Sequence, residues 1–226
     1  MSSQSLSEHR TTGIQPSPGE EFANAITHGV GLALSVTGAV LMAAVLLSHG
    51  DPWRTIGCSV YLASLVAVYA TSTLSHSCTK PRWKSFFRSL DQGFIYFLIA
   101  ATYTPISLTY LRTGVWWLLL GAVWAVALYG FVSKVFFAHR VEAVYVWPYI
   151  VLGWLPILSV PKLLSIVDDH TGFLLMLIGG LCYTFGAVFL VCDRKVRHFH
   201  AVWHLFVIAG STCHFLAILL FIANAG

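Results

Sequence analysis

Charged residues are scarce in this chain, and Cys-x-x-Cys pairs are absent. Only 10% of the 226 residues are Asp, Glu, Lys or Arg, whereas 57% are hydrophobic. Soluble domains do not have this composition, and long uncharged runs are typical of polytopic membrane proteins. The five cysteines are scattered, which argues against a disulfide framework and against a thiolate zinc site. The net charge of +4 gives no indication of nucleic-acid binding.

Seven runs are long enough to span a bilayer, which takes about 19 residues or more. They predict an all-α membrane protein with a seven-transmembrane-helix bundle. The expected helices cover about residues 22–48, 55–77, 91–111, 113–133, 143–160, 171–192 and 199–225. The polar residues 1–21 are interpreted as a flexible cytoplasmic tail, and residues 22–226 as one transmembrane domain. The basic segment 80–89 carries Trp83, Phe86 and Phe87, which suggests a turn of interfacial helix.

The distribution of basic residues predicts the orientation. One side of the membrane holds the N-terminus and the loops after the second, fourth and sixth helices. Ten of the basic residues lie on this side: Arg10, Lys80, Arg82, Lys84, Arg88, Lys134, Arg140, Arg194, Lys195 and Arg197. The other side has Arg54, Arg112 and Lys162. By the positive-inside rule the N-terminus is inside and the C-terminus is outside.

Three histidines are expected at the cytoplasmic depth. His200 and His204 are i and i+4 at the start of the last helix, about 6 Å apart along its axis and on one face. His76 lies in the last turn of the second helix. Zinc held by three imidazoles keeps a fourth position for water, whose pKa falls to about 7. The pattern therefore predicts a Zn²⁺ site at His76, His200 and His204.

Two further polar residues are expected beside this site. Asp91 is placed in the first turn of the third helix, where it acts as general base or orients the water. Ser72, one turn deeper than His76, is placed to bond the aspartate or the polarised substrate oxygen. Basic loop residues around the site would attract anionic lipid headgroups.

Structural alternatives exist for each of these residues. His76 can cap its helix or meet headgroups, and Ser72 can bond its own i−4 carbonyl. Asp91 can form a surface ion pair with Arg88, or its negative charge can be stabilised by the helix dipole near the N-terminus of its helix. Asn24 and His28 are i and i+4, and we expect them to form hydrogen bonds between helices. His214 is too far from His200 to share one metal ion, so a buried hydrogen-bonding role is expected.

At these residues the chain resembles the hemolysin III family within the progestin and adipoQ receptor (PAQR) proteins, in its bacterial form. The matching segments run from the first helix to the last: 21–29, 72–76, 90–91, 95–105, 200–204 and 214–215. One departure is Gln92, where many relatives have His. The resemblance implies a seven-helix bundle with the same orientation, and zinc bound by His76, His200 and His204 with Ser72 and Asp91 alongside. It also implies a multi-pass protein of the bacterial inner membrane, in a superfamily considered to consist of lipid-amide hydrolases and linked to membrane homeostasis.

Three functions remain open. The first is a zinc-dependent integral membrane hydrolase that cleaves a lipid amide, as a ceramidase does. The second is a receptor-like lipid sensor in which zinc is structural. The third is a cytolysin or pore, which should show polar stripes through several helices, whereas the fourth to sixth helices show almost none.

Overall fold

The computed structural model describes residues 16–49, 51–137 and 145–223, and these residues form helices and connections without a strand. The long helices are α2 (Pro18–His49), α3 (Pro52–Ser77), α4 (Pro81–Tyr110), α5 (Val115–Phe136), α8 (Thr171–Cys192) and α9 (Phe199–Ile218). Between α5 and α8 lie the short α6 (Trp147–Trp154), the 3₁₀-helix η2 (Leu155–Ser159) and α7 (Val160–Leu164). A π-helix, η3 (Leu219–Ala223), continues α9.

Six helical segments are long and apolar enough to cross a membrane: Pro18–Ser48, Pro52–Ser77, Val115–Phe136, Trp147–Leu164, Thr171–Cys192 and Phe199–Ala223. The helix α4 is long but is not among them. Its buried face carries hydroxyl groups, of which Thr102 and Thr104 donate to the carbonyls of Leu98 and Ala100 in their own helix. Because α4 also carries Arg82, Lys84, Arg88 and Asp91 in its first three turns, its sequence is less apolar than those of the six segments.

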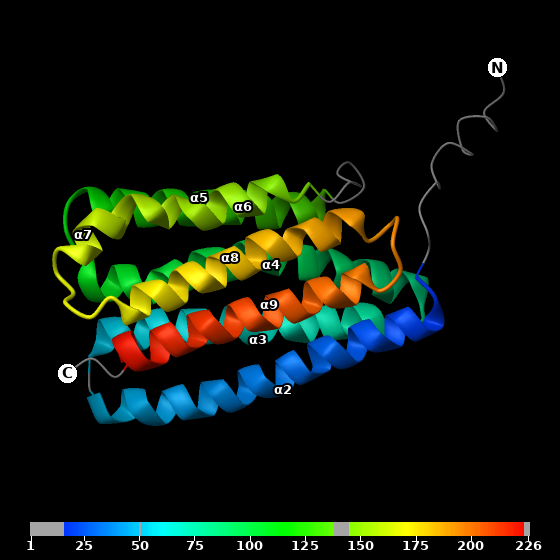
Figure 1. The fold of residues 1–226 in the computed structure, drawn as a ribbon, viewed down its shortest axis with the longest axis horizontal. Helices are drawn as coiled ribbons and strands as arrows, with labels where there is room; N and C mark the ends of the chain where they lie inside the picture. The colour runs from blue at the N-terminus through cyan, green and yellow to red at the C-terminus, as the bar shows by residue number, and fades with distance from the viewer. Residues whose placement is uncertain (1–15, 50, 138–144, 224–226) are drawn as a thin grey trace, which may run out of the picture.

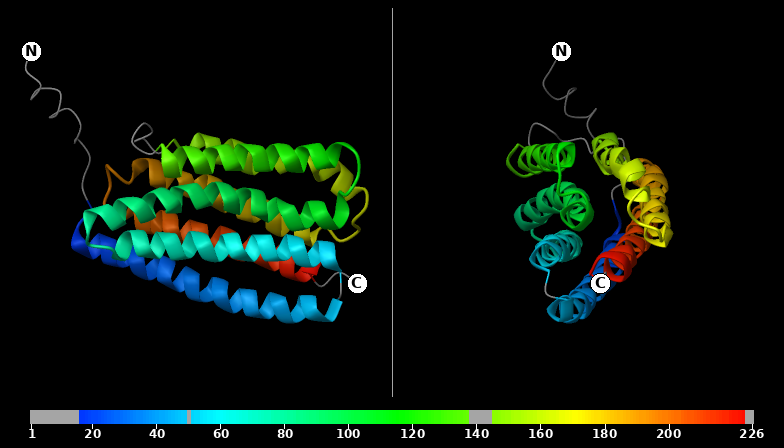
Figure 2. Two further views of the ribbon diagram at one scale, coloured as in Figure 1. Left: turned by 180° about the vertical axis from the view of Figure 1, so that it is seen from behind. Right: turned by 90° about the vertical axis from the view of Figure 1, so that its left-hand side faces the viewer.

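The helices form two curved layers that meet at α2 (Figures 1 and 2). In the end-on view of Figure 2, α2, α3, α4 and α5 follow one another on one side, and α9, α8 and the α6–α7 segment form the other. The start of α2 and the end of η3 lie at opposite ends of the bundle (Figure 1). This arrangement brings the first and last helices together and leaves space between the layers.

Two glycine contacts allow close packing. A Cβ atom on Gly57 would lie 2.7 Å from the Pro105 Cα, so α3 can approach α4 here only because Gly57 has no side chain. A Cβ on Gly179 would lie 3.0 Å from the carbonyl oxygen of Gly210, and a Cβ on Gly210 would lie 3.1 Å from that of Gly179. The absence of side chains at these two positions allows α8 to approach α9 closely. These contacts fix the two layers that surround the interior.

Several predicted boundaries differ in the structure. The first helix begins at Pro18 instead of residue 22. The third begins at Pro81, so the expected interfacial turn is the start of α4, and Asp91 is not in its first turn. The predicted fifth helix is broken, because Pro156 and Pro161 each remove a backbone donor and η2 forms between α6 and α7. Residues 1–15 of the expected tail, and residues 143, 144, 224 and 225 of the predicted spans, lie outside the described part.

Candidate metal centre

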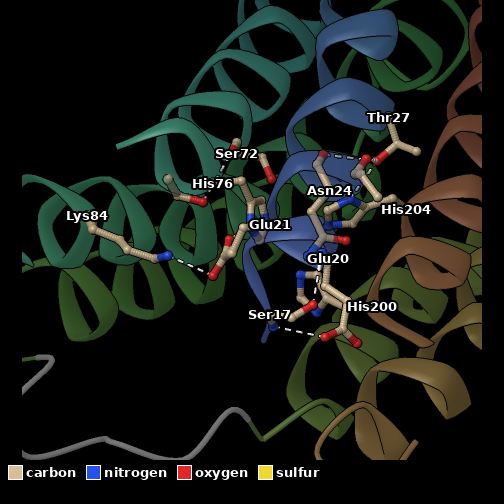
Figure 3. Close-up of polar contacts among 12 residues, drawn as sticks. Ser17, Glu20, Glu21, Asn24, Thr27, Ser72, His76, Lys84, His200 and His204 are labelled. Carbon is tan, nitrogen blue, oxygen red and sulfur yellow. Dashed lines mark hydrogen bonds and ion pairs between the residues drawn. The ribbon is translucent and has the colours of Figure 1, made fainter. Parts of the chain in front are cut away.

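His76, His200 and His204 come together at one end of the bundle (Figure 3). Their ring centroids are 5.1 Å apart for His76 and His200, 5.2 Å for His76 and His204, and 4.6 Å for the pair on α9. One nitrogen from each ring lies within 4.8 Å of the other two, so the group can hold a metal ion. The predicted convergence of the second and seventh helices is therefore found.

A carboxylate on α2 orients His76. The Nδ1 atom of His76 is 2.8 Å from Oε2 of Glu21, and the other oxygen of Glu21 accepts a hydrogen bond of 2.6 Å from Lys84 Nζ. A carboxylate accepts hydrogen bonds, so Nδ1 carries the proton and Nε2 keeps its lone pair. His76 thus faces His200 and His204 and does not cap its helix.

The two histidines of α9 are held through Nδ1 as well. His200 Nδ1 lies 2.9 Å from Oδ2 of Asp193, and His204 Nδ1 lies 3.0 Å from Oγ1 of Thr27. Thr27 donates its single proton to the carbonyls of Ala23 and Asn24, so it accepts from His204. In all three rings Nδ1 is the donor and Nε2 is the available ligand atom, the arrangement that partner residues impose on metal-binding histidines.

The ligand set fits zinc. Neutral imidazoles are good zinc ligands, and the Zn–N distance of about 2.0–2.1 Å allows two ligands to be at most about 4.2 Å apart. Since the nitrogens lie within 4.8 Å, small rotations of the side chains suffice to close the group around one ion.

The first turn of α2 also fixes the start of α9. Glu20 accepts the backbone N–H of Ser17 at 2.8 Å, while Ser17 Oγ accepts that of Glu20 at 3.3 Å, which is a capping box. The other Glu20 oxygen accepts the backbone N–H of His198 at 3.1 Å, and His198 has the left-handed backbone φ of 63° that directs the chain into α9. Glu20 therefore helps to place His200 and His204.

Four of these supporting residues were missed in the sequence analysis: Glu20, Glu21, Thr27 and Asp193. Ser17 and Glu20 match the Ser-x-x-Glu pattern of a capping box, and adjacent acids before an apolar run are a usable signal. Thr27 gives no signal, because its partner is 177 positions away. Asp193 lies seven positions before His200 in a turn, which is not a metal-site spacing.

The prediction for His28 was wrong. Its ring contacts that of His204 with a centroid distance of 3.6 Å and a tilt of 42°, and both ring nitrogens are buried without a hydrogen-bond partner in the described residues. His28 therefore supports the position of His204 by contact and does not bond to another helix. His214 is the buried hydrogen-bonding residue that was expected, with Nε2 3.0 Å from the carbonyl oxygen of Met176.

Ser72 and Asp91 lie beside the histidines. Ser72 is 1% exposed, and its Oγ is not bonded to its own helix but lies within reach of the Asp91 carboxyl group. The carboxyl group of Asp91 also interacts electrostatically with His200. Asp91 is about three turns into α4 and lines the same cavity as the three histidines.

These residues line one end of a cavity of about 520 Å³. Ser72, Asp91 and the three histidines are at that end, whereas Tyr110, Gly172 and Phe221 line the other, and most of the wall is apolar. The cavity lies between the layer that contains α4 and the layer that contains α8 and α9. Its shape and polarity suit an amphiphile with its polar end at the histidines.

Comparison with known proteins agrees with this arrangement. A family model described as "Haemolysin-III related" matches residues 17–215. The chain is 39% identical over 203 residues to "Hemolysin-3" of Bacillus cereus, covering 90% of this chain and 92% of the relative. It is 37% identical to "Hemolysin-3 homolog" of Bacillus subtilis (strain 168), covering 89% and 94%. It is 28% identical to human "Monocyte to macrophage differentiation factor", covering 90% and 85%. With its apolar helices, the chain is a multi-pass integral membrane protein that belongs to the haemolysin-III-related family.

Proposed function

We propose that this protein is a zinc-dependent membrane hydrolase that cleaves an amide bond in a lipid. The observation that carries the proposal is the convergence of three histidines, with one nitrogen of each within 4.8 Å of the others, beside a carboxyl group at the end of a largely apolar cavity. The cavity offers space for an acyl chain, and the polar end lies where an amide carbonyl would meet the metal.

Each residue of the site has a stated task in this proposal. His76, His200 and His204 would hold the zinc, which would lower the pKa of a water molecule to about 7. Asp91 takes a proton from the attacking water and later returns it to the nitrogen of the leaving amine, so that an amide and water become an acid and an amine. Ser72 orients the Asp91 carboxyl group or bonds the substrate oxygen.

The proposal includes the orientation of the chain. We assign seven spans, with the N-terminus inside and the protein in the bacterial inner membrane. The seven are the six apolar segments given above and α4. With 30 residues α4 is about 45 Å long, more than the roughly 30 Å of a hydrocarbon core. The metal centre then lies at the cytoplasmic headgroup level.

The substitution Asp91→Asn tests the catalytic role. Asn keeps the size of the side chain but cannot take up the proton, so hydrolysis of a lipid amide should fall by on the order of 10²–10⁴-fold. The variant should fold and keep its zinc, measured by metal analysis of the purified protein. The matched control is Asp169→Asn, which makes the same change at the far end of the cavity.

A second function is a receptor-like lipid sensor with a structural metal. It is favoured by the origin of the ligands, because the site ties α3 to α9, and two of its supporting residues, Glu21 and Thr27, lie on α2. If wild type cleaves no lipid amide while Asp91→Asn loses zinc or unfolds, this function replaces the first. The cytolysin hypothesis gains no support from the mostly apolar cavity wall.

A further inference from the structure

Two of the polar side chains that line the cavity far from the metal centre lie beside each other. Tyr183 on α8 and His214 on α9 both line the cavity, and their ring centroids are 5.4 Å apart. His214 follows His204 by ten residues, which is about 15 Å along the axis of α9. The two rings therefore lie near the middle of the bundle, beyond reach of the metal.

His214 presents a hydrogen-bond acceptor. Its Nε2 bonds to the Met176 carbonyl oxygen at 3.0 Å, and a carbonyl only accepts, so the N–H of the neutral ring is at Nε2. The lone pair is then at Nδ1. Within the part of the chain that the structure describes, Nδ1 has no hydrogen-bond partner, although the residue is only 9% exposed.

Tyr183 presents a donor. Tyr69 donates to Ser211 Oγ at 3.0 Å, and the oxygens of Ser211 and Tyr183 are 2.7 Å apart. These three hydroxyl groups have three protons but form only two bonds with one another, so one proton is left over. The bond between Ser211 and Tyr183 can form with either oxygen as the donor. When Ser211 donates, the O–H of Tyr183 is the one left over, and it lies at the cavity wall.

We propose that Tyr183 and His214 recognise a hydroxyl group in the middle of a long lipid chain. The Tyr183 O–H donates to the ligand oxygen, and the ligand O–H donates to His214 Nδ1. A hydroxyl group is both donor and acceptor, so it satisfies the two wall groups at once. The inference rests on the proposed function, in which the head of the lipid lies at the metal centre.

The expected consequence is that lipids with and without this hydroxyl group bind with different affinities. A lipid chain without a hydroxyl group that fills the cavity leaves the Tyr183 O–H and His214 Nδ1 buried and unpaired, which costs binding free energy. A chain with a hydroxyl group at the right depth pairs both. A hydroxyl group next to the head would lie at the metal centre and gain nothing from Tyr183 and His214.

The test is displacement of a fluorescent fatty acid from the purified protein in detergent. The competitors are octadecanoic, 12-hydroxyoctadecanoic and 2-hydroxyoctadecanoic acid, and the 12-hydroxy acid should bind about 3- to 10-fold more tightly than the others. Tyr183→Phe should abolish this preference, and His214→Leu serves as a second variant. The control is Tyr110→Phe, since Tyr110 lines the cavity but already donates to the Phe221 carbonyl.

The outcomes separate this inference from the proposed function. Equal binding of the three acids by wild type overturns the hydroxyl site and leaves the lipid cavity in place. Binding of none of them overturns both. A preference that survives in both Tyr183→Phe and His214→Leu also overturns the inference. Because the readout is a ratio within each variant, differences in overall stability or in detergent partition do not produce the expected result.

Discussion

At the scale of single residues, the metal centre depends on the groups behind the histidines. A ring held through Nδ1 presents Nε2 in a fixed direction, so less conformational entropy is lost when the ion binds. Glu21 and Asp193 have this role for His76 and His200. The same bonds make each ring a better ligand, because the carboxylate stabilises positive charge on the imidazole.

We therefore expect Glu21→Gln and Asp193→Asn to weaken zinc binding by about 10- to 100-fold each. Competition with a chromophoric chelator measures the affinity. Asp51→Asn is the control, because Asp51 caps α3 at Trp53 and is not part of the metal centre. Affinities equal to wild type in both variants would show that the two carboxylates do not support the site.

The histidines themselves allow a more direct measurement. The double variant His200→Ala, His204→Ala removes both ligands from α9, and one remaining imidazole cannot retain the ion. Purified wild type should contain about one zinc per chain and the double variant almost none. Full zinc content in the double variant would remove α9 from the metal centre.

At the scale of helices, the contact of α3 with α4 depends on Gly57. A methyl group at this position would meet the Pro105 backbone at 2.7 Å, and backbone atoms cannot rotate out of the way. The helices must then move apart, and α3 and α4 carry His76, Ser72 and Asp91. The packing of these two helices thus sets the distances within the site.

Gly57→Ala should destabilise the protein by about 1–3 kcal/mol through overpacking. Gly121 on α5 is the matched control, since an added Cβ there has no neighbour within 4 Å. Gly121→Ala should leave stability unchanged or raise it by up to about 1 kcal/mol, because alanine favours the helix. Thermal unfolding in detergent compares the two, and equal midpoints would contradict the contact described for Gly57.

At the scale of the whole molecule, the ten-to-three distribution of basic residues predicts the orientation that we propose. Reporter fusions at Met1 and at Gly226 should give opposite compartments, with the N-terminus inside. The same compartment for both would mean an even number of spans. In that case α4 would be the first helix to reconsider, since it is not among the six most apolar segments.

The three histidines could be predicted from the sequence because two lie one turn apart and the charge distribution places the third at the same depth. Glu21 and Thr27 could not, since they lie 55 and 177 positions from the rings they hold and only the folded bundle brings them together. The donor and acceptor at Tyr183 and His214 likewise depend on which partners the fold supplies.

Helix boundaries could be predicted where the apolar run and the helix end at the same residues. This is the case for α8, whose observed bounds are those expected. The boundaries could not be predicted where a helix extends into a segment of charged residues, as at the start of α4. The break between α6 and α7 was also missed, because membrane helices tolerate proline and Pro156 alone does not reveal a 3₁₀ segment.

The pairing of α2 with α9 has a consequence for biosynthesis. The ribosome delivers α2 first and α9 last, so Thr27, Glu20 and Glu21 are inserted long before two of the three metal ligands exist. A chain whose translation stops before residue 199 carries a single ligand histidine and cannot retain the ion. Metal binding by all three histidines is then possible only after α9 has been synthesised, and it distinguishes chains that include α9 from shorter ones.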